Sequence, residues 1–243
     1  MAEPVEMPAM GQAQEQAWHA LIDLHNRIGG GWTLIGGQLV HLHCAERGAI
    51  PTRPTDDIDT VVDVRASPEL LQTFTGTLAA MGFRPETSGD GIQHRWRRDL
   101  AQIDVLIPDG VGERAAQRAG AGGAPTIRSP GTTQALNRSE TISVRVGSKS
   151  GLIPRPNLMG ALVGKAAART EIAADRASAR HCFDFVALAG LVAARDLRDT
   201  ELTKKDRQRL RRMLEHCRNE ADVMATENAG ESLERLARAA ELD

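Results

Sequence analysis

A short apolar segment between Pro51 and Val64, with the sequence PTRPTDDIDTVVDV, carries four aspartates. From Ile58 onward it has the aliphatic and β-branched residues of a buried β-strand. An unpaired carboxylate is costly to bury, so each of these acids is expected to face either solvent or a positive ligand. The stretch constrains the fold, because a strand that presents carboxylates must lie where they can be neutralised.

The spacing of the four acids separates them into two groups. Side chains alternate along a strand, so Asp57, Asp59 and Asp63 are predicted to share one face, with Asp56 pointing away from it. At ~3.3 Å per residue, the Cα atoms of Asp57 and Asp59 are ~7 Å apart and Asp63 lies ~13 Å beyond Asp59. Two metal ions in a phosphoryl-transfer site lie ~3.5–4 Å apart. Asp57 and Asp59 can therefore share such ions, whereas Asp56 and Asp63 are expected to be structural or solvated.

A third candidate acid, Asp104, interrupts a second apolar strand from Ala101 to Ile107. If the two strands are neighbours in one sheet, Asp104 completes a cluster with Asp57 and Asp59. Three close carboxylates repel one another, and a bound divalent cation is the usual reason for such a cluster. Solvated acids at a strand edge are the alternative interpretation of the Asp-x-Asp pair.

The residues upstream of the acids favour the first interpretation. A predicted strand at 32–35 is followed by Gly36 and Gly37, and then by a predicted helix from Gln38 to about Arg47. A helix N-terminus offers free N–H groups and the positive end of the helix dipole, which suit a triphosphate. Glycine lets the backbone approach such a ligand closely.

Composition narrows the class of protein without naming a function. The chain has 243 residues, of which 41% are hydrophobic and 26% charged, and its net charge is −2, as in an ordinary globular protein. The first ten residues contain no apolar signal core, and no apolar run is long enough to span a membrane. Three distant cysteines fit neither a disulfide framework nor a zinc site. We expect a cytoplasmic protein that does not associate with membranes.

The pattern of elements predicts an α+β fold, with a mixed sheet flanked by helices and a helical bundle after it. The predicted α/β core covers residues 1–154, with 1–12 loose, and the helical domain covers 155–243. Ser67 and Pro68 predict a helix start with proline at the first helical position. The Gly/Ala-rich segment 110–125 is predicted to be a loop. The predicted helices of the second half are 157–172, 175–194, 200–220 and 231–242.

At this point the chain resembles a known superfamily. The segments LIGGQLVHLHCAERGAIPTRPTDDIDTVV and IDVLI are similar to the nucleotidyltransferase fold of the DNA polymerase β type. More narrowly, GTTQALNRSETISV and IPRPNLMGALVGKAAA resemble the AbiEii-like nucleotidyltransferase toxins of bacterial toxin–antitoxin systems. The resemblance covers roughly residues 16 to 195, and its Asp-x-Asp motif is the most specific part.

The resemblance implies roles for individual residues. Asp57 and Asp59 would hold two Mg²⁺ ions, with Mn²⁺ as a possible substitute, and Asp104 would bind the ion next to the attacking hydroxyl. Gly36 and Gly37 would cradle the β- and γ-phosphates, and Lys165 would pair with phosphate. The remaining nucleotide-binding residues would be Gln38, Arg53, Thr55 and Asp184.

Several of these assignments have plainer alternatives. Relatives often carry Thr or Ser where this chain has Gln38, and a Lys-Asp pair where it has RHCFD, of which only Asp184 matches. Lys165 could be a surface lysine on an alanine-rich helix. Arg53 and Thr55 could simply cap the turn before the acids, and Asp184 could form an ion pair within its own helix.

The function implied by the resemblance is metal-dependent transfer of NMP from an NTP to an RNA 3′ end, with tRNA as the acceptor. The protein would act as a toxin with a cognate antitoxin as partner. A nucleotidyltransferase acting on a small molecule such as an antibiotic is the alternative, and a catalytically inactive nucleotide-binding module is another. The basic segment KKDRQRLRR at 204–212 could contact RNA backbone, or could be a solvated helix face that packs its leucines inward.

Overall fold

The acids lie on two neighbouring strands of a six-stranded mixed sheet. The structure is a computed structural model that describes residues 3–171, 178–198 and 200–242. The sheet has the order β2-β3-β6-β5-β4, with β7 paired to β6. Its strands are β2 (Trp32–Ile35), β3 (Ile58–Val62), β4 (Arg84–Glu86), β5 (Arg95–Arg98), β6 (Ala101–Pro108) and β7 (Arg128–Ser129). β3 and β6 run parallel, whereas β2 and β5 pair antiparallel to them.

A second, smaller sheet has the order β1-β8-β9. Its strands are β1 (Val5–Glu6), β8 (Ser139–Val146) and β9 (Lys149–Pro156). Because Val5 pairs with Val144 and Met7 is buried, the prediction that residues 1–12 are loose is wrong for the described part from residue 3 onward. Residues 1 and 2 lie outside the described residues.

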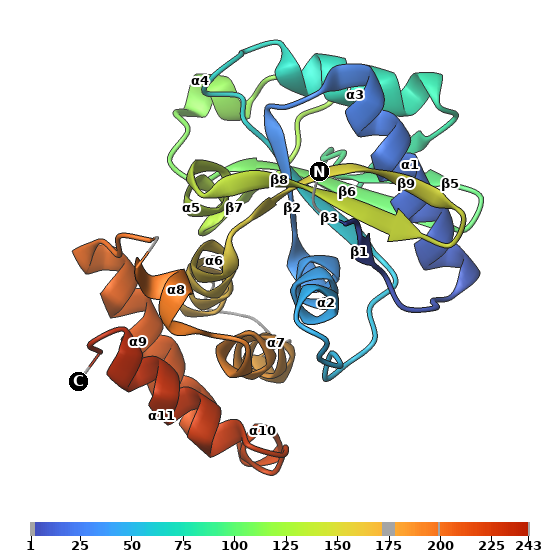
Figure 1. Cartoon of the computed structure of the whole chain (residues 1–243). Helices are drawn as coiled ribbons and strands as arrows, with labels where there is room; N and C mark the ends of the chain where they lie inside the picture. The colour runs from blue at the N-terminus through green and yellow to red at the C-terminus, as the bar shows by residue number, and fades with distance from the viewer. Residues whose placement is uncertain (1–2, 172–177, 199, 243) are drawn as a thin grey trace.

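Helices lie on both sides of the central sheet. In Figure 1, α3 and α4 lie above it and α2 lies below it. The helices of the first part are α1 (Gln12–Ile28), α2 (Gly36–Glu46), α3 (Leu70–Ala80), α4 (Glu113–Ala116) and α5 (Thr132–Asn137). The strands β3 and β6 are buried along most of their length, which explains why apolar residues surround Asp59 and Asp104.

The C-terminal part is helical and lies at the lower left of Figure 1. It consists of α6 (Leu158–Glu171), α7 (Ser178–Gly190), α8 (Ala194–Arg198), α9 (Lys204–Arg218), α10 (Ala221–Met224) and α11 (Ala229–Ala239). Thr203 caps α9, since its hydroxyl accepts from the Asp206 N–H and the Asp206 carboxylate accepts from the Thr203 N–H. The predicted α+β class, with a mixed sheet, flanking helices and a helical C-terminal part, is confirmed.

Some local predictions differ from the structure. The helix predicted at Pro68 begins at Leu70, after a turn. The predicted loop 110–125 contains the short helix α4, and β9 was not predicted because its prolines and arginine mask the alternation of a strand. β9 continues past the proposed domain boundary at residue 154, and that division stays a prediction. The part of the predicted helices that falls on residues 172–177 lies outside the described residues.

None of the described helices combines the length and the apolar character needed to cross a membrane.

Candidate functional site

Sheet register brings the three predicted acids together. The parallel pairing of β3 and β6 places Asp59 directly beside Asp104, and Asp57 precedes β3 by one residue. One carboxylate oxygen from each of the three lies within 4.8 Å of the others. Mg²⁺ and Mn²⁺ prefer oxygen ligands of this kind, so the donor set fits a hard divalent cation.

The cluster is electrostatically strained without a cation. Burial, together with the nearby carboxylates of Asp57 and Asp104, raises the pKa of Asp59 to about 7, although Lys165 and Arg53 act in the opposite direction. A carboxyl group with such a pKa is partly protonated at neutral pH. A bound cation would offset the repulsion among the three carboxylates, and Asp59 would then lose its proton more readily.

Arg95 is a partner of the cluster that the sequence did not single out. Antiparallel pairing of β5 and β6 places it opposite Asp104, and its Nε and Nη2 atoms each donate to Asp104 at 3.1 Å. Gln102 Nε2 also donates to Asp104, at 3.2 Å. The only sequence signal was the alternation of arginines in RWRR, which places Arg95 and Arg97 on one face of the strand.

The other two aspartates of the opening segment stay outside the cluster, as predicted. Asp56 is exposed. Asp63 accepts from Arg65 Nε at 2.8 Å and from Arg65 Nη2 at 2.9 Å, and this bond lowers the pKa of its carboxyl. Spacing along the strand therefore distinguished the four acids correctly.

Gly36 and Gly37 make room for the cluster itself. Gly36 has φ +75°, a conformation that side chains other than glycine rarely adopt. A Cβ atom on Gly36 would overlap the Asp59 carboxylate, and one on Gly37 would lie 2.7 Å from Thr55 Cγ2. Thr55 in turn donates its hydroxyl to Asp57 Oδ1 at 2.8 Å. The two glycines at the start of α2 are thus needed for the position of the acids, whatever they do for phosphate.

Gly36→Ala is expected to lower the melting temperature and to abolish binding of Mg²⁺·NTP, because the new methyl group displaces Asp59. Gly30→Ala is the matched control, since a Cβ atom there meets nothing within 4 Å. Thermal unfolding and titration with nucleotide measure both effects. Equal behaviour of the two variants would contradict this account of Gly36.

Gln38 supports the site from the interior. Its side chain is buried, accepts from Trp18 Nε1 at 2.9 Å and donates to the Thr55 carbonyl at 2.6 Å. Gln14 donates to the same carbonyl. The side chain of Gln38 thus fixes the turn that carries Thr55, and its nucleotide contact stays a prediction.

Asp184 joins two cations from distant parts of the chain. Arg53 donates to its two oxygens from Nε and Nη2, both at 2.8 Å, and Lys165 Nζ donates to Oδ2 at 2.6 Å. Burial alone would raise the pKa of Asp184, but Lys165 and Arg53 outweigh it and hold the pKa below its usual value. The expected alternative of a pair within the helix is not what the structure shows, and Lys165 is a buried residue rather than a surface lysine.

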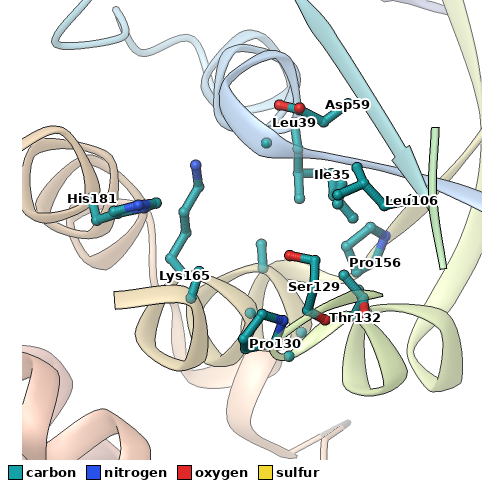
Figure 2. A pocket seen from close by; sticks show the side chains of 17 residues that line it. Ile35, Leu39, Asp59, Leu106, Ser129, Pro130, Thr132, Pro156, Lys165 and His181 are labelled. Atoms are coloured by element: carbon teal, nitrogen blue, oxygen red, sulfur yellow. Dashed lines mark hydrogen bonds between the residues drawn. The ribbon is translucent and has the colours of Figure 1, made fainter. Parts of the chain in front are cut away.

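A cavity of about 180 Å³, called here the Lys165 cavity, opens beside Asp59 and Gly36. In Figure 2, Lys165 extends between His181 and Ser129 toward the part of the cavity where Asp59 lies. Small and apolar residues form the rest of the wall: Ile35, Leu39, Leu106, Pro130, Gly131, Thr132, Ala135, Pro156, Gly160, Ala161, Gly164 and Ala168. The cavity thus offers an apolar body with charged groups at one end, as small-molecule sites do.

Asp109 holds the wall of this cavity in place. Its carboxylate accepts from the backbone N–H of Gly131 at 3.1 Å and of Thr133 at 2.8 Å. These bonds fix the turn that begins α5, the GTT part of the segment that resembled a known family. Its two partners lie 22 and 24 residues downstream, so no local sequence pattern indicates this role of Asp109.

A second cavity, of about 550 Å³, lies against Asp57. It is polar and is called here the Arg97 cavity. Its lining residues are Arg53, Pro54, Thr55, Asp56, Asp57, Arg97, Asp99, Leu100, Gln102 and Arg180. Each of the two cavities therefore meets a different member of the Asp-x-Asp pair.

Three arginines of the basic segment 204–212 make contacts within the protein. Arg207 donates to the carbonyl of Ala240 and Arg211 to that of Leu242, both of which follow α11 in the sequence. Arg209 is buried, and its Nη2 atom lies 3.8 Å from an oxygen of Asp109. Lys204, Lys205, Arg211 and Arg212 are nevertheless exposed, so these contacts support packing for part of the segment, and contact with RNA backbone stays a prediction.

The comparisons with known proteins agree with this geometry at the level of the fold. No protein-family model and no curated protein matches the chain. Among solved structures it is similar to an antigenic nucleotidyltransferase-like protein from Paracoccidioides brasiliensis, with a TM-score of 0.51 over 94% of this chain and 95% of that chain. The chain has a nucleotidyltransferase-like fold. At 15% sequence identity the likeness shows the fold alone, and the closer relation to AbiEii-type toxins stays a prediction.

Proposed function

We propose that this protein is a nucleotidyltransferase that moves NMP from an NTP to an acceptor hydroxyl. The acceptor oxygen forms a bond to the α-phosphorus, the bond from that phosphorus to the β-phosphate oxygen breaks, and pyrophosphate leaves with the hydroxyl proton released. The observation that carries the proposal is the convergence of Asp57, Asp59 and Asp104 beside Gly36 and Lys165. Positioning and charge neutralisation suffice for this chemistry, without a covalent intermediate on the protein.

Asp57, Asp59 and Asp104 would hold the divalent cations, which the oxygen donor set and the raised pKa of Asp59 both support. Bound Mg²⁺ supplies charge neutralisation at the transferred phosphate and a lower pKa for the attacking hydroxyl. Arg95 holds Asp104 by two hydrogen bonds and so fixes the orientation of the third ligand.

The Lys165 cavity would take the nucleotide. Its apolar walls suit the nucleoside, and the N-terminus of α2 together with the Lys165 amine suits the phosphates. Asp184 orients Lys165 by the bond at 2.6 Å and also binds Arg53. Lys165 lines this cavity, whereas Arg53 lines the Arg97 cavity. Without the carboxylate of Asp184, the two positive groups would repel each other.

We propose an RNA 3′ end, with tRNA as the leading candidate, as the acceptor, and a toxin role neutralised by a cognate antitoxin. This part rests on the resemblance of the sequence segments quoted above. A small molecule such as an antibiotic, or binding of nucleotide without turnover, remain outcomes of the test. Growth arrest on expression of the wild type but not of an Asp59→Asn variant would support the toxin role.

The activity test uses labelled NTPs, MgCl₂ and total tRNA. Wild-type protein should transfer label, and Asp57→Asn should reduce the rate about 10³-fold, because a lost charge-stabilising contact costs ~10²–10³ in rate. Asp63→Asn is the control, since its carboxylate bonds only within its own turn among the described residues. No transfer by wild type, or equal transfer by Asp57→Asn, would refute the proposal.

A further inference from the structure

We infer that the Arg97 cavity is the acceptor subsite and that Arg97 and Arg180 hold a backbone phosphate of a polynucleotide there. This inference rests on the proposed function, because it names the acceptor of that same site. Transfer needs the attacking and leaving oxygens roughly in line. One cavity meets Asp59 and the other meets Asp57, so donor and acceptor can approach the same carboxylates from separate cavities.

The sheet builds a polar row that leads from the carboxylates into this cavity. Arg97 lies opposite Gln102 on β6 and donates to its side-chain oxygen at 2.9 Å, and Gln102 donates to Asp104 at 3.2 Å. Arg97 is two residues beyond Arg95 on the same face, which is ~7 Å farther from Asp104 along the strand. A terminal hydroxyl at the acids would therefore place the phosphate of the same nucleotide near Arg97.

The arginines of this cavity differ in how many of their N–H donors are already engaged. Arg53 is held by Asp184 through two hydrogen bonds. Arg97 donates one N–H to Gln102 and one to Glu86, and about half of its side chain is exposed. A guanidinium has five N–H donors, so Arg97 retains donors for a phosphate. Arg180, from the start of α7, is exposed on the same cavity.

The cavity is lined by three arginines and three aspartates, so the acceptor class follows from which of these charges are already engaged. Asp56, Asp57 and Asp99 also line it, so a cationic antibiotic has partners here as well. Asp57, however, is assigned to the cations of the site, and a positive ligand would then meet the remaining arginines together with those cations. Guanidinium forks match phosphate oxygens in geometry and charge. The exposed Leu100 beside them offers an apolar surface for a sugar or base.

The test measures binding of a fluorescent single-stranded RNA with a free 3′-hydroxyl, in MgCl₂ without NTP. Arg97→Gln and Arg180→Gln should each weaken binding about tenfold and reduce the salt dependence by about one phosphate contact. Arg114→Gln changes an exposed arginine on α4 that does not line the cavity, and this variant should bind as wild type does. Asp99→Asn should bind RNA at least as tightly as wild type, because it removes a negative charge from the cavity. Thermal unfolding confirms that each variant is folded.

Binding of Mg²⁺·NTP to the same variants separates this inference from the proposed function. If NTP binds normally and RNA binding is unchanged in both arginine variants, the subsite assignment is wrong while the nucleotide site stands. Arginine-dependent binding of a nucleoside 5′-monophosphate as tight as that of the RNA would contradict a polynucleotide acceptor. Binding of an aminoglycoside, used as a cationic probe, that is weakened by Asp99→Asn but not by the arginine variants would indicate a cationic acceptor instead.

Discussion

Asp59→Asn is expected to abolish nucleotidyl transfer and to make the metal-free protein more stable at pH 8. Transfer should fall about 10³-fold, because the substitution removes the carboxylate shared by the cation site. Stability should rise, because the same substitution removes a charge that burial and two neighbouring acids disfavour. Loss of activity together with a gain of stability is typical of residues retained for function.

The raised pKa of Asp59 determines how the stability of the wild-type protein changes with pH. In the unfolded chain the carboxyl titrates near 3.8, whereas in the folded protein its pKa is raised to about 7. Between these values the folded state binds more protons, so its stability falls as the pH rises. A shift of about three units corresponds to ~4 kcal/mol, which is an upper limit because Asp59 is only half-buried.

Urea unfolding of wild type and Asp59→Asn at pH 5 and pH 8, without metal, measures the effect. The advantage of the variant should be larger at pH 8, and MgCl₂ should stabilise only the wild type. Asp63→Asn serves as control, since Arg65 lowers the pKa of Asp63 and no gain is expected from its removal. Equal stability of wild type and Asp59→Asn at pH 8 would show that the cluster carries no such strain.

The sequence predicted the acids because they obey local rules. Alternation along one strand separated Asp57 and Asp59 from Asp56, and distance along the strand separated them from Asp63. An isolated acid in an apolar run marked Asp104. Periodicity alone does not predict which strands pair. The register of β3 against β6 places Asp59 beside Asp104, 45 residues later in the sequence.

The partners of the acids were harder to predict because they depend on long-range packing. Arg95 reaches Asp104 only through the pairing of β5 with β6. The contact between Arg53 and Asp184 joins residues 131 positions apart, and nothing local distinguishes Asp184 from an acid paired within its helix. The short elements α5 and β9 were missed for a related reason, since Asp109 caps α5 from a distant turn and prolines interrupt β9.

Asp184→Ala is expected to be among the most destabilising single substitutions in this chain. The Asp184 carboxylate is 2% exposed and accepts hydrogen bonds from Arg53 and Lys165. Removing one partner of a buried ion pair typically costs ~3–5 kcal/mol, because the remaining charge stays without compensation. Asp63→Ala removes an equally close but local and more exposed pair with Arg65, and should cost less than ~1 kcal/mol.

Urea unfolding at pH 7 measures this difference. The contribution of Asp184 is present above pH 3.8 and is lost as the pH falls below that value, because the pKa of its carboxyl is held below normal in the folded protein. Asp184→Asn should lie between wild type and Asp184→Ala. A cost for Asp184→Ala no larger than that for Asp63→Ala would contradict the assignment of Asp184 as the shared counter-ion.

Inorganic triphosphate adds a second readout to the same variant. If Asp184 holds Arg53 and Lys165 near each other in order to receive phosphate, an added polyanion should replace part of the negative charge that Asp184→Ala removes. Triphosphate should then stabilise Asp184→Ala more than it stabilises wild type, since a ligand stabilises the state that it binds more tightly. A purely structural ion pair would give equal stabilisation of both proteins. The comparison therefore tests whether these two cations belong to the binding site or only to the core.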